Sequence, residues 1–288
     1  MFKYKQYFFL IFLSFVISNT SYQGLLLPVN SYLLLNSNSN YTLSKNILLN
    51  NSETKRLGST FVSFPHNINI GSFSYSHKIF DKYNSQYNIT VIDYGRFVDS
   101  ESNYTFSAKD LIFTHNSSIK RGDFTHQSQS IKYIHSSIGQ YDANAIALEF
   151  NLYFHFNNFV ITPFLKNYGI IVNSYTDYVD SLPESYGASL VYKLQYLDAL
   201  LSAQYQSFNT YDEYNFYGEL FIFDQSSISI GYTSIANTLY YGDFNYDLFT
   251  GINLGLNTKY KDYVLNIGVK NLGALGTIHS ISFNKLFN

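Results

Sequence analysis

The sequence predicts an all-β protein, a transmembrane antiparallel β-barrel of about 14 strands. Three observations favour this fold class: an export signal at the N-terminus, a residue alternation of period 2, and an unusual composition. Of the 288 residues, 13% are charged and 19% are aromatic, whereas an average soluble chain has about 25% charged residues. This composition suits a sheet with one face in lipid and the other in water, although an AT-rich genome would bias it in the same direction.

The first residues are typical of a secretory signal peptide. Lys3 and Lys5 precede an apolar run, Tyr7–Ile17, and small polar residues follow it at Ser18–Ser21. This order of charged, apolar and small residues is that of a cleaved signal, and the run is too short for a membrane-spanning helix, which needs about 20 residues. We therefore expect residues 1–21 to be a signal peptide, with an uncleaved anchor as the alternative.

Apolar and polar residues alternate through most of the remaining chain. Near the C-terminus, for example, Leu265 and Ile267 alternate with Asn266 and Gly268. The polar partners are mostly Ser, Asn, Gln and Gly, whereas a soluble sheet would place Lys, Glu and Arg on its wet face. Period 2 predicts strands, and uncharged polar partners favour a barrel whose polar face lines a lumen.

The pattern predicts 14 strands, an even number, as in single-chain bacterial outer-membrane barrels. The expected strands are 58–65, 68–79, 86–97, 108–117, 130–140, 144–155, 158–166, 184–194, 198–206, 214–223, 226–233, 247–258, 261–270 and 277–287. Long connections and short turns mostly alternate, which places both chain ends in the periplasm; the connection 118–129 is too long for this pattern. We expect residues 58–288 to form the barrel and residues 22–57 to form a periplasmic segment that could partly plug it.

Aromatic residues gather near the expected strand ends, where barrels carry aromatic girdles at both membrane interfaces. The alternative is the general preference of Tyr and Phe for strands. The residues concerned are Tyr75, Phe80, Tyr83, Tyr87, Tyr94, Phe97, Tyr192, Tyr196, Tyr205, Phe208, Tyr260 and Tyr263.

Several motifs, taken in order, resemble the PorV/PorQ family of outer-membrane barrels, and its PorQ branch in particular. They are Asn69–His77, the block Tyr94-Gly95-Arg96-Phe97, Phe106–Asp110 and the final hairpin Gly255–Phe283. Barrels of this family have 14 strands and are FadL-like, that is, similar to the long-chain fatty-acid channel. Some members belong to the type IX secretion system of Bacteroidota. The resemblance implies an outer-membrane location, a role in protein secretion or surface-protein attachment, and protein partners in such a complex.

The longest expected outer loop, 167–183, is a candidate contact surface for a protein partner. Tyrosine supplies contact area at low entropic cost and is enriched at binding hot spots. The candidate residues are Tyr168, Tyr175, Asp177, Tyr178 and Asp180. The carboxylates of this loop could instead bind Ca²⁺, but a solvated acidic loop is the preferred interpretation.

Four charged residues, Asp93, Glu149, Glu219 and Lys270, fall inside expected strands. Because a charge on the lipid face costs up to about 2–4 kcal/mol, we expect these side chains to point into the lumen or to lie near an interface. Inward charges could gate a pore, or they could fill the lumen by pairing with one another.

No arrangement of residues in the sequence predicts catalysis, a metal site or a cofactor site. The chain has no cysteine, its seven histidines are scattered, and its net charge of −2 gives no attraction to nucleic acid. We expect a non-enzymatic protein of the outer membrane whose surroundings are the lipid bilayer. Its function is either a part in protein secretion or surface assembly, as in the PorV/PorQ family, or that of a channel for small or hydrophobic solutes; the lack of a fixed repeat argues against a β-solenoid adhesin.

Overall fold

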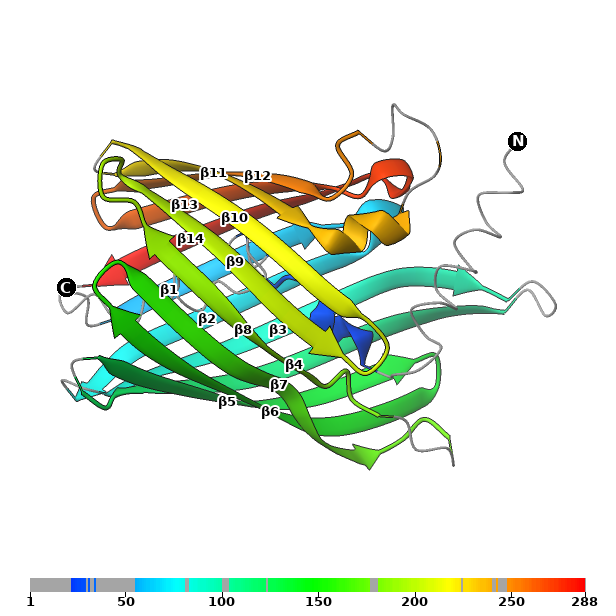
Figure 1. Ribbon diagram of the computed structural model, residues 1–288. Coiled ribbons are helices and arrows are strands. Elements are labelled where there is room, and N and C mark those ends of the chain that lie inside the picture. The colour runs from blue at the N-terminus through cyan, green and yellow to red at the C-terminus, as the bar shows by residue number, and fades with distance from the viewer. Residues whose placement is uncertain are drawn as a thin grey trace.

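The chain folds into a closed antiparallel barrel in which each strand pairs with its sequence neighbours and β1 pairs with β14 (Figure 1). The computed structural model describes residues 22–29, 31, 34, 55–80, 83–99, 104–122, 124–176, 181–223, 225–239, 242 and 248–287. The expected signal peptide, 1–21, lies outside the described residues, as do residues 35–54 of the expected N-terminal segment. The predicted fold class is confirmed.

Fourteen strands, named here in chain order, make up the wall of the barrel. They are β1 (Lys55–Ser63), β2 (Asn69–Phe80), β3 (Tyr83–Val98), β4 (Thr105–Lys120), β5 (Thr125–Ile138), β6 (Tyr141–Phe156), β7 (Phe159–Asn173), β8 (Ser185–Lys193), β9 (Ala199–Phe208), β10 (Asp212–Phe223), β11 (Ser226–Thr233), β12 (Ile252–Tyr260), β13 (Tyr263–Asn271) and β14 (Thr277–Phe287). Each overlaps one of the predicted strands.

Several strands extend beyond their predicted ends. The expected loop 118–129 is wrong, because β4 and β5 continue their pairing from Ser118↔Ser128 to Lys120↔His126. The turn between them is short, so the alternation of long and short connections now holds there as well. Similarly, β7 runs to Asn173, and β1 begins at Lys55 rather than at residue 58.

The strands of the barrel differ in length. Strands β3 to β7 have 14 to 16 residues each, whereas β8 and β9 have 9 and 10. β7 pairs with β8 only from Phe159 to Lys166, so residues 167–173 of β7 extend past the end of β8. The wall formed by β3 to β7 is therefore taller at the end of the barrel opposite the C-terminus (Figure 1).

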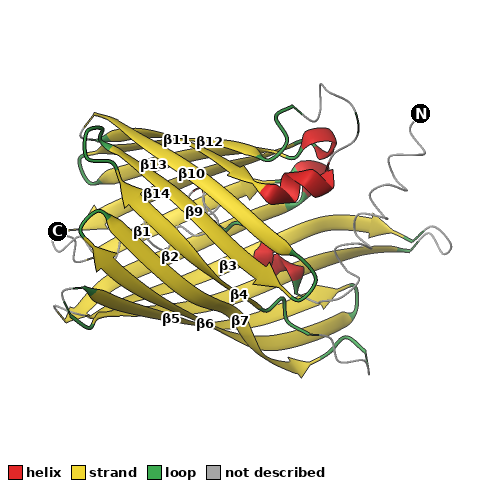
Figure 2. Ribbon diagram, in the orientation of Figure 1, coloured by secondary structure: helices red, strands yellow, loops and turns green. Residues whose placement is uncertain are grey.

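Short 3-10 helices lie toward the end of the barrel opposite the C-terminus (Figure 2). They are η1 (Gln23–Leu26), η3 (Pro65–Asn67), η4 (Ser234–Leu239) and η5 (Gly273–Leu275). Within the described part of the chain, no helix is long and apolar enough to cross a membrane.

The outer wall is apolar and the inner wall is mainly polar, as the alternation predicts. In β12, Leu254 is 54% exposed on the outside, while the adjacent Asn253 is 4% exposed on the inside. Other outward residues include Phe61, Phe73, Ile89, Phe113, Ile131, Leu148, Leu201, Ile230 and Ile281. Because closure leaves no unpaired sheet edge around the wall, such a barrel can span a bilayer. The chain is an outer-membrane barrel in contact with lipid.

Candidate functional site

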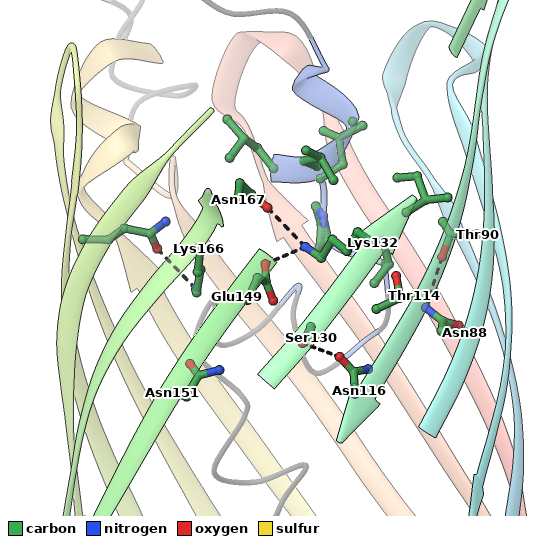
Figure 3. Close-up of a pocket in the computed structure, with 18 of the residues that line it drawn as sticks. Asn88, Thr90, Thr114, Asn116, Ser130, Lys132, Glu149, Asn151, Lys166 and Asn167 are labelled. Carbon is green, nitrogen blue, oxygen red and sulfur yellow. Dashed lines mark hydrogen bonds and ion pairs between the residues drawn. The ribbon is translucent and has the colours of Figure 1, made fainter. Parts of the chain in front are cut away.

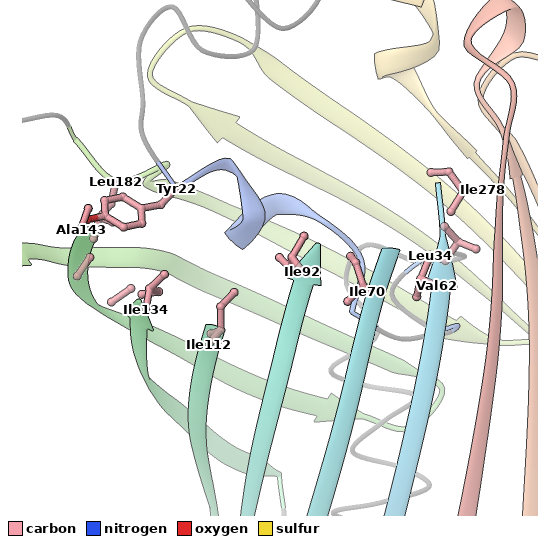
Figure 4. Packing of buried hydrophobic residues seen from close by; sticks show 12 residues of the cluster. Tyr22, Leu34, Val62, Ile70, Ile92, Ile112, Ile134, Ala143, Leu182 and Ile278 are labelled. Carbon is pink, nitrogen blue, oxygen red and sulfur yellow. The ribbon is translucent and has the colours of Figure 1, made fainter. Parts of the chain in front are cut away.

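An N-terminal segment, of which residues 22–29, 31 and 34 are described, crosses the lumen. Figure 4 shows it running from Tyr22, beside Ala143 and Leu182, to Leu34, beside Val62 and Ile278. We call these described residues the crossing segment. The two ends of the crossing segment therefore contact opposite walls of the barrel.

Hydrogen bonds from several strands hold the backbone of the crossing segment. The Ser72 hydroxyl on β2 donates to the Val29 carbonyl oxygen at 3.1 Å, and the Asn253 amide on β12 donates to the Leu34 carbonyl oxygen at 3.1 Å. The hydroxyls of Ser31 and Ser282 lie 2.9 Å apart, and both are buried. Backbone groups inside a lumen need such partners, and the inward Ser and Asn residues provide them.

Apolar side chains on the inner wall pack against both ends of the crossing segment. We call this set the apolar collar; it contains Val62, Ile70, Ile92, Ile112, Ile134, Ala143, Ala145, Ala147, Leu182 and Ile278. Tyr22 and Leu34 are buried against it, with 7% and 1% of their surfaces exposed. Burying a large apolar side chain contributes about 1.5–3 kcal/mol, so the collar stabilises the segment in its crossing position.

A buried carboxylate, Asp110 on β4, lies directly beneath Gly24 of the crossing segment. Its oxygens accept hydrogen bonds from the Tyr94 hydroxyl at 2.7 Å and from the Ser136 hydroxyl. The Tyr175 hydroxyl donates in turn to Ser136. A Cβ at Gly24 would overlap Asp110 Oδ2 and would lie 2.7 Å from the Tyr94 hydroxyl oxygen. Only glycine therefore fits here without displacing the segment or this cluster of hydroxyl and carboxyl groups.

The family-like block divides between the lumen and the rim of the barrel. Tyr94 points inward to Asp110, so its expected place in an aromatic girdle is wrong. Gly95 has a φ of +87°, a conformation that suits glycine, at an irregularity in the pairing of β3 with β4. Arg96 is exposed, and Phe97 stacks on Phe106 with ring centroids 5.4 Å apart.

The residues predicted to contact a protein partner do not form one group among the described residues. Tyr168 lies in β7 and is partly exposed, whereas Tyr175 follows β7 and points its hydroxyl at Ser136. Burial raises the pKa of Tyr175 to about 12. Asp177, Tyr178 and Asp180 lie outside the described residues.

A cavity of about 320 Å³ lies in the lumen next to the crossing segment (Figure 3). Gly24 to Val29 form one side of it, which includes three consecutive leucines. The barrel wall supplies mainly amide, hydroxyl and charged groups, among them Asn88, Thr90, Thr114, Asn116, Ser130, Asn151 and Gln206. The cavity is thus apolar on the side of the segment and polar on the side of the wall.

Among the residues that the structure describes, five charged side chains line the cavity. The Lys132 ammonium contacts Glu149 Oε1 at 2.5 Å and Asn167 Oδ1 at 3.2 Å. The other three are Lys166, Glu213 and Lys270. The Lys166 ammonium lies 3.5 Å from Gln206 Oε1 and 4.5 Å from the centre of the Phe164 ring.

The expectation that charged residues within strands point into the lumen is confirmed for three of the four residues. Glu149 and Lys270 line the cavity, and Glu219 is buried on the inner wall, where it accepts hydrogen bonds from Ser227 and Asn257. Asp93 lies on the outside, exposed and 3.6 Å from the ammonium of Lys109. Within the described ranges, no three His, Asp or Glu side chains gather as metal ligands would.

Comparison with known proteins gives matches in structure alone. No family model and no curated protein matches the sequence. Among solved structures, the toluene transporter TodX of Pseudomonas putida is similar with a TM-score of 0.52 at 8% identity, over 81% of this chain and 89% of that chain. The Ralstonia pickettii toluene transporter TbuX gives 0.56 at 11% identity, over 82% and 90%. CymD, a monoaromatic hydrocarbon channel, gives 0.58 at 9% identity, over 85% and 93%.

The fold is that of a FadL-like outer-membrane barrel. At 8% to 11% identity, the likeness concerns the path of the chain, and it extends over four-fifths of the molecule. The described part of the chain agrees with this fold in strand number and in closure.

Proposed function

We propose that this chain is an outer-membrane channel for small solutes, hydrophobic ones included, in which the crossing segment closes the lumen until it is displaced. The observation that carries the proposal is the cavity of about 320 Å³ between the crossing segment and the barrel wall. Pockets for small molecules begin at about this size. The names of TodX, TbuX and CymD, which describe transporters or channels for aromatic hydrocarbons, support the same function.

Displacement of the crossing segment is the step that we expect to limit passage. Its backbone is held by a few hydrogen bonds and its ends by the apolar collar, whereas the barrel wall is held by the pairing of all its strands. The segment can therefore leave its position at a smaller cost in free energy than any strand.

The substitution Gly24→Val tests whether the crossing segment closes the channel. The new side chain would collide with Asp110 and Tyr94, so it should displace the segment and raise solute exchange. The measurement is the exchange of labelled sorbitol and labelled gluconate across proteoliposomes, with unlabelled solute on the other side. Gly71→Val is the matched control, because nothing lies within 4 Å of the position of its Cβ.

We expect Gly24→Val to accelerate exchange on the order of tenfold and Gly71→Val to match the unaltered protein, with both barrels folded. If neither the unaltered protein nor Gly24→Val exchanged sorbitol or gluconate faster than empty liposomes, a channel for polar solutes would be rejected.

A role in protein secretion is the second candidate, and the resemblance of Tyr94-Gly95-Arg96-Phe97 to the PorQ branch favours it. In a strain that lacks this protein, the two functions predict different losses. A secretion component would lower the amount of surface proteins, whereas a channel would lower the uptake of small solutes such as toluene. Normal amounts of surface proteins together with reduced solute uptake would rule out the secretion role. Reduced amounts of surface proteins together with normal solute uptake would rule out the channel.

A further inference from the structure

Charges of alternating sign surround the cavity. In order around the barrel they are Lys132 on β5, Glu149 on β6, Lys166 on β7, Glu213 on β10 and Lys270 on β13. We call these five residues the charge belt. It contains three cations and two carboxylates, although the chain as a whole carries a net charge of −2. Among the described residues that line the cavity, cations therefore outnumber carboxylates by one.

One pair in the charge belt is already neutralised. Lys132 and Glu149 form an ion pair at 2.5 Å, and their side chains are only 15% and 14% exposed. Asn167 accepts a further hydrogen bond from the same ammonium. This close pair leaves little net charge for a solute to meet on that part of the wall.

The remaining three members of the belt are arranged differently. Glu213 accepts hydrogen bonds from the Asn215 amide and the Thr233 hydroxyl, both at 3.0 Å. Lys166 on β7 and Lys270 on β13 line the same cavity as Glu213 on β10. Within the described part of the chain, Lys270 forms no ion pair. Lys270 thus faces the cavity without an ion pair, and the hydrogen bonds of Glu213 come from Asn215 and Thr233.

We infer that the charge belt selects small polar organic anions, carboxylates that carry hydroxyl groups, in preference to neutral solutes of the same size. This inference rests on the proposed channel function. An inward ammonium without an ion pair is stabilised by an anionic solute, and cationic side chains around a pore favour anions. The Asn, Thr and Ser side chains of the wall supply partners for hydroxyl groups, and pure hydrocarbons would leave those partners unused.

The test compares gluconate with sorbitol, which have the same six-carbon skeleton and differ by a carboxylate at one end. Labelled solute is exchanged against unlabelled solute across proteoliposomes, so that no net charge moves. The measured quantity is the ratio of the two exchange rates, in the unaltered protein and in the Gly24→Val background. We expect gluconate to exchange faster, and Lys270→Gln to lower the ratio on the order of tenfold.

Two further variants separate charge from structural damage. Glu213→Gln keeps an oxygen that can accept from Asn215 and Thr233 but removes the negative charge, so the ratio should rise. Lys270→Glu should bring the ratio below one. Damage to the barrel would instead change the exchange rates of both solutes together. Only a charge effect would lower the ratio in the Lys270 variants and raise it in Glu213→Gln.

Lys109→Gln is the matched control, because it removes the same charge from an exposed lysine on the outer side of β4. It should leave the ratio unchanged. If sorbitol and gluconate exchanged at equal rates, or if Lys109→Gln lowered the ratio as much as Lys270→Gln, the inference would be overturned while the channel remained. If neither solute exchanged, the inference would be overturned; the channel would be rejected as well if the strain that lacks this protein took up toluene normally.

Discussion

Neighbouring residues of one strand lie in different solvents. Leu254 faces lipid with 54% of its surface exposed, and Asn253, the residue before it, faces the lumen and donates a hydrogen bond to the crossing segment. Because side chains alternate strictly along a strand, a shift of one residue would exchange these two surroundings. Substitutions at adjacent positions should therefore have different consequences.

Leu254→Arg should impair insertion of the barrel, because a charge near the middle of the bilayer costs about 2–4 kcal/mol. Asn253→Arg should insert normally but should displace Leu34, whose carbonyl oxygen accepts from Asn253. Fractionation and the difference in migration between boiled and unboiled samples measure insertion and folding. Equal loss of the folded barrel in both variants would contradict the assignment of faces.

Some residues of the cavity could be predicted from the sequence, and others could not. Glu149 and Lys270 interrupt apolar strands, so the cost of burying charge in lipid already places them inside. Lys132 carries the same signal, because it stands between Ile131 and Tyr133, which face outward. The sequence predicts Glu213 as the last residue of a loop, but it lies in β10. Lys166 precedes Asn167, whose φ of +59° interrupts the alternation of the strand.

Strands could be predicted where their two faces differ in polarity and were missed where both faces are polar. β13 and β14 alternate clearly, and their observed bounds lie within two residues of the predicted ones, whereas β12 begins at Ile252 rather than at residue 247. In contrast, the facing ends of β4 and β5 contain mainly polar residues on both sides, such as Ser117, Ser118 and Gln127. Their pairing depends on the neighbouring strand, which hydrophobic periodicity does not report.

The crossing segment is the element that the sequence identified least well. Leu25 to Leu27 are consecutive and show no period, so only their contacts within the lumen reveal what they do. Leu34 is almost completely buried against the collar, at a distance along the chain from every strand that it touches. The contribution of Leu34 to holding the crossing segment can be tested separately from its contribution to the stability of the barrel.

Leu34→Ala should loosen the crossing segment, because removing a buried leucine side chain costs about 2–5 kcal/mol. We expect faster hydrogen exchange in residues 22–29 and faster exchange of solutes, with unchanged melting of the barrel. Leu254→Ala serves as the control, since the same truncation on the outer wall leaves the lumen intact. If the loss of Leu34 lowered the melting temperature of the whole barrel and left residues 22–29 protected, the segment would be part of the barrel core instead.

At the scale of the whole molecule, closure and filling of the barrel have separate causes. β1 and β14 pair over nine residues, from Lys55↔Phe287 to Ser63↔His279, and so complete the ring. Filling depends on the inner wall, where apolar residues form the collar and polar residues form the cavity. The outer surface can therefore stay adapted to lipid while substitutions of inward residues change the shape and polarity of the cavity.

The unequal heights of the wall give the mouth of the barrel a direction. β6 has 16 residues and β8 has 9, and at roughly 3.3 Å per residue the longer strand extends roughly 23 Å further. The wall of the barrel is therefore high along β3 to β7 and low along β8 and β9. A bulky molecule at the membrane surface would meet the high wall on the side of β3 to β7 and the low wall on the side of β8 and β9. If the chain is a channel, we expect solutes to reach the cavity more easily over β8 and β9 than over β3 to β7.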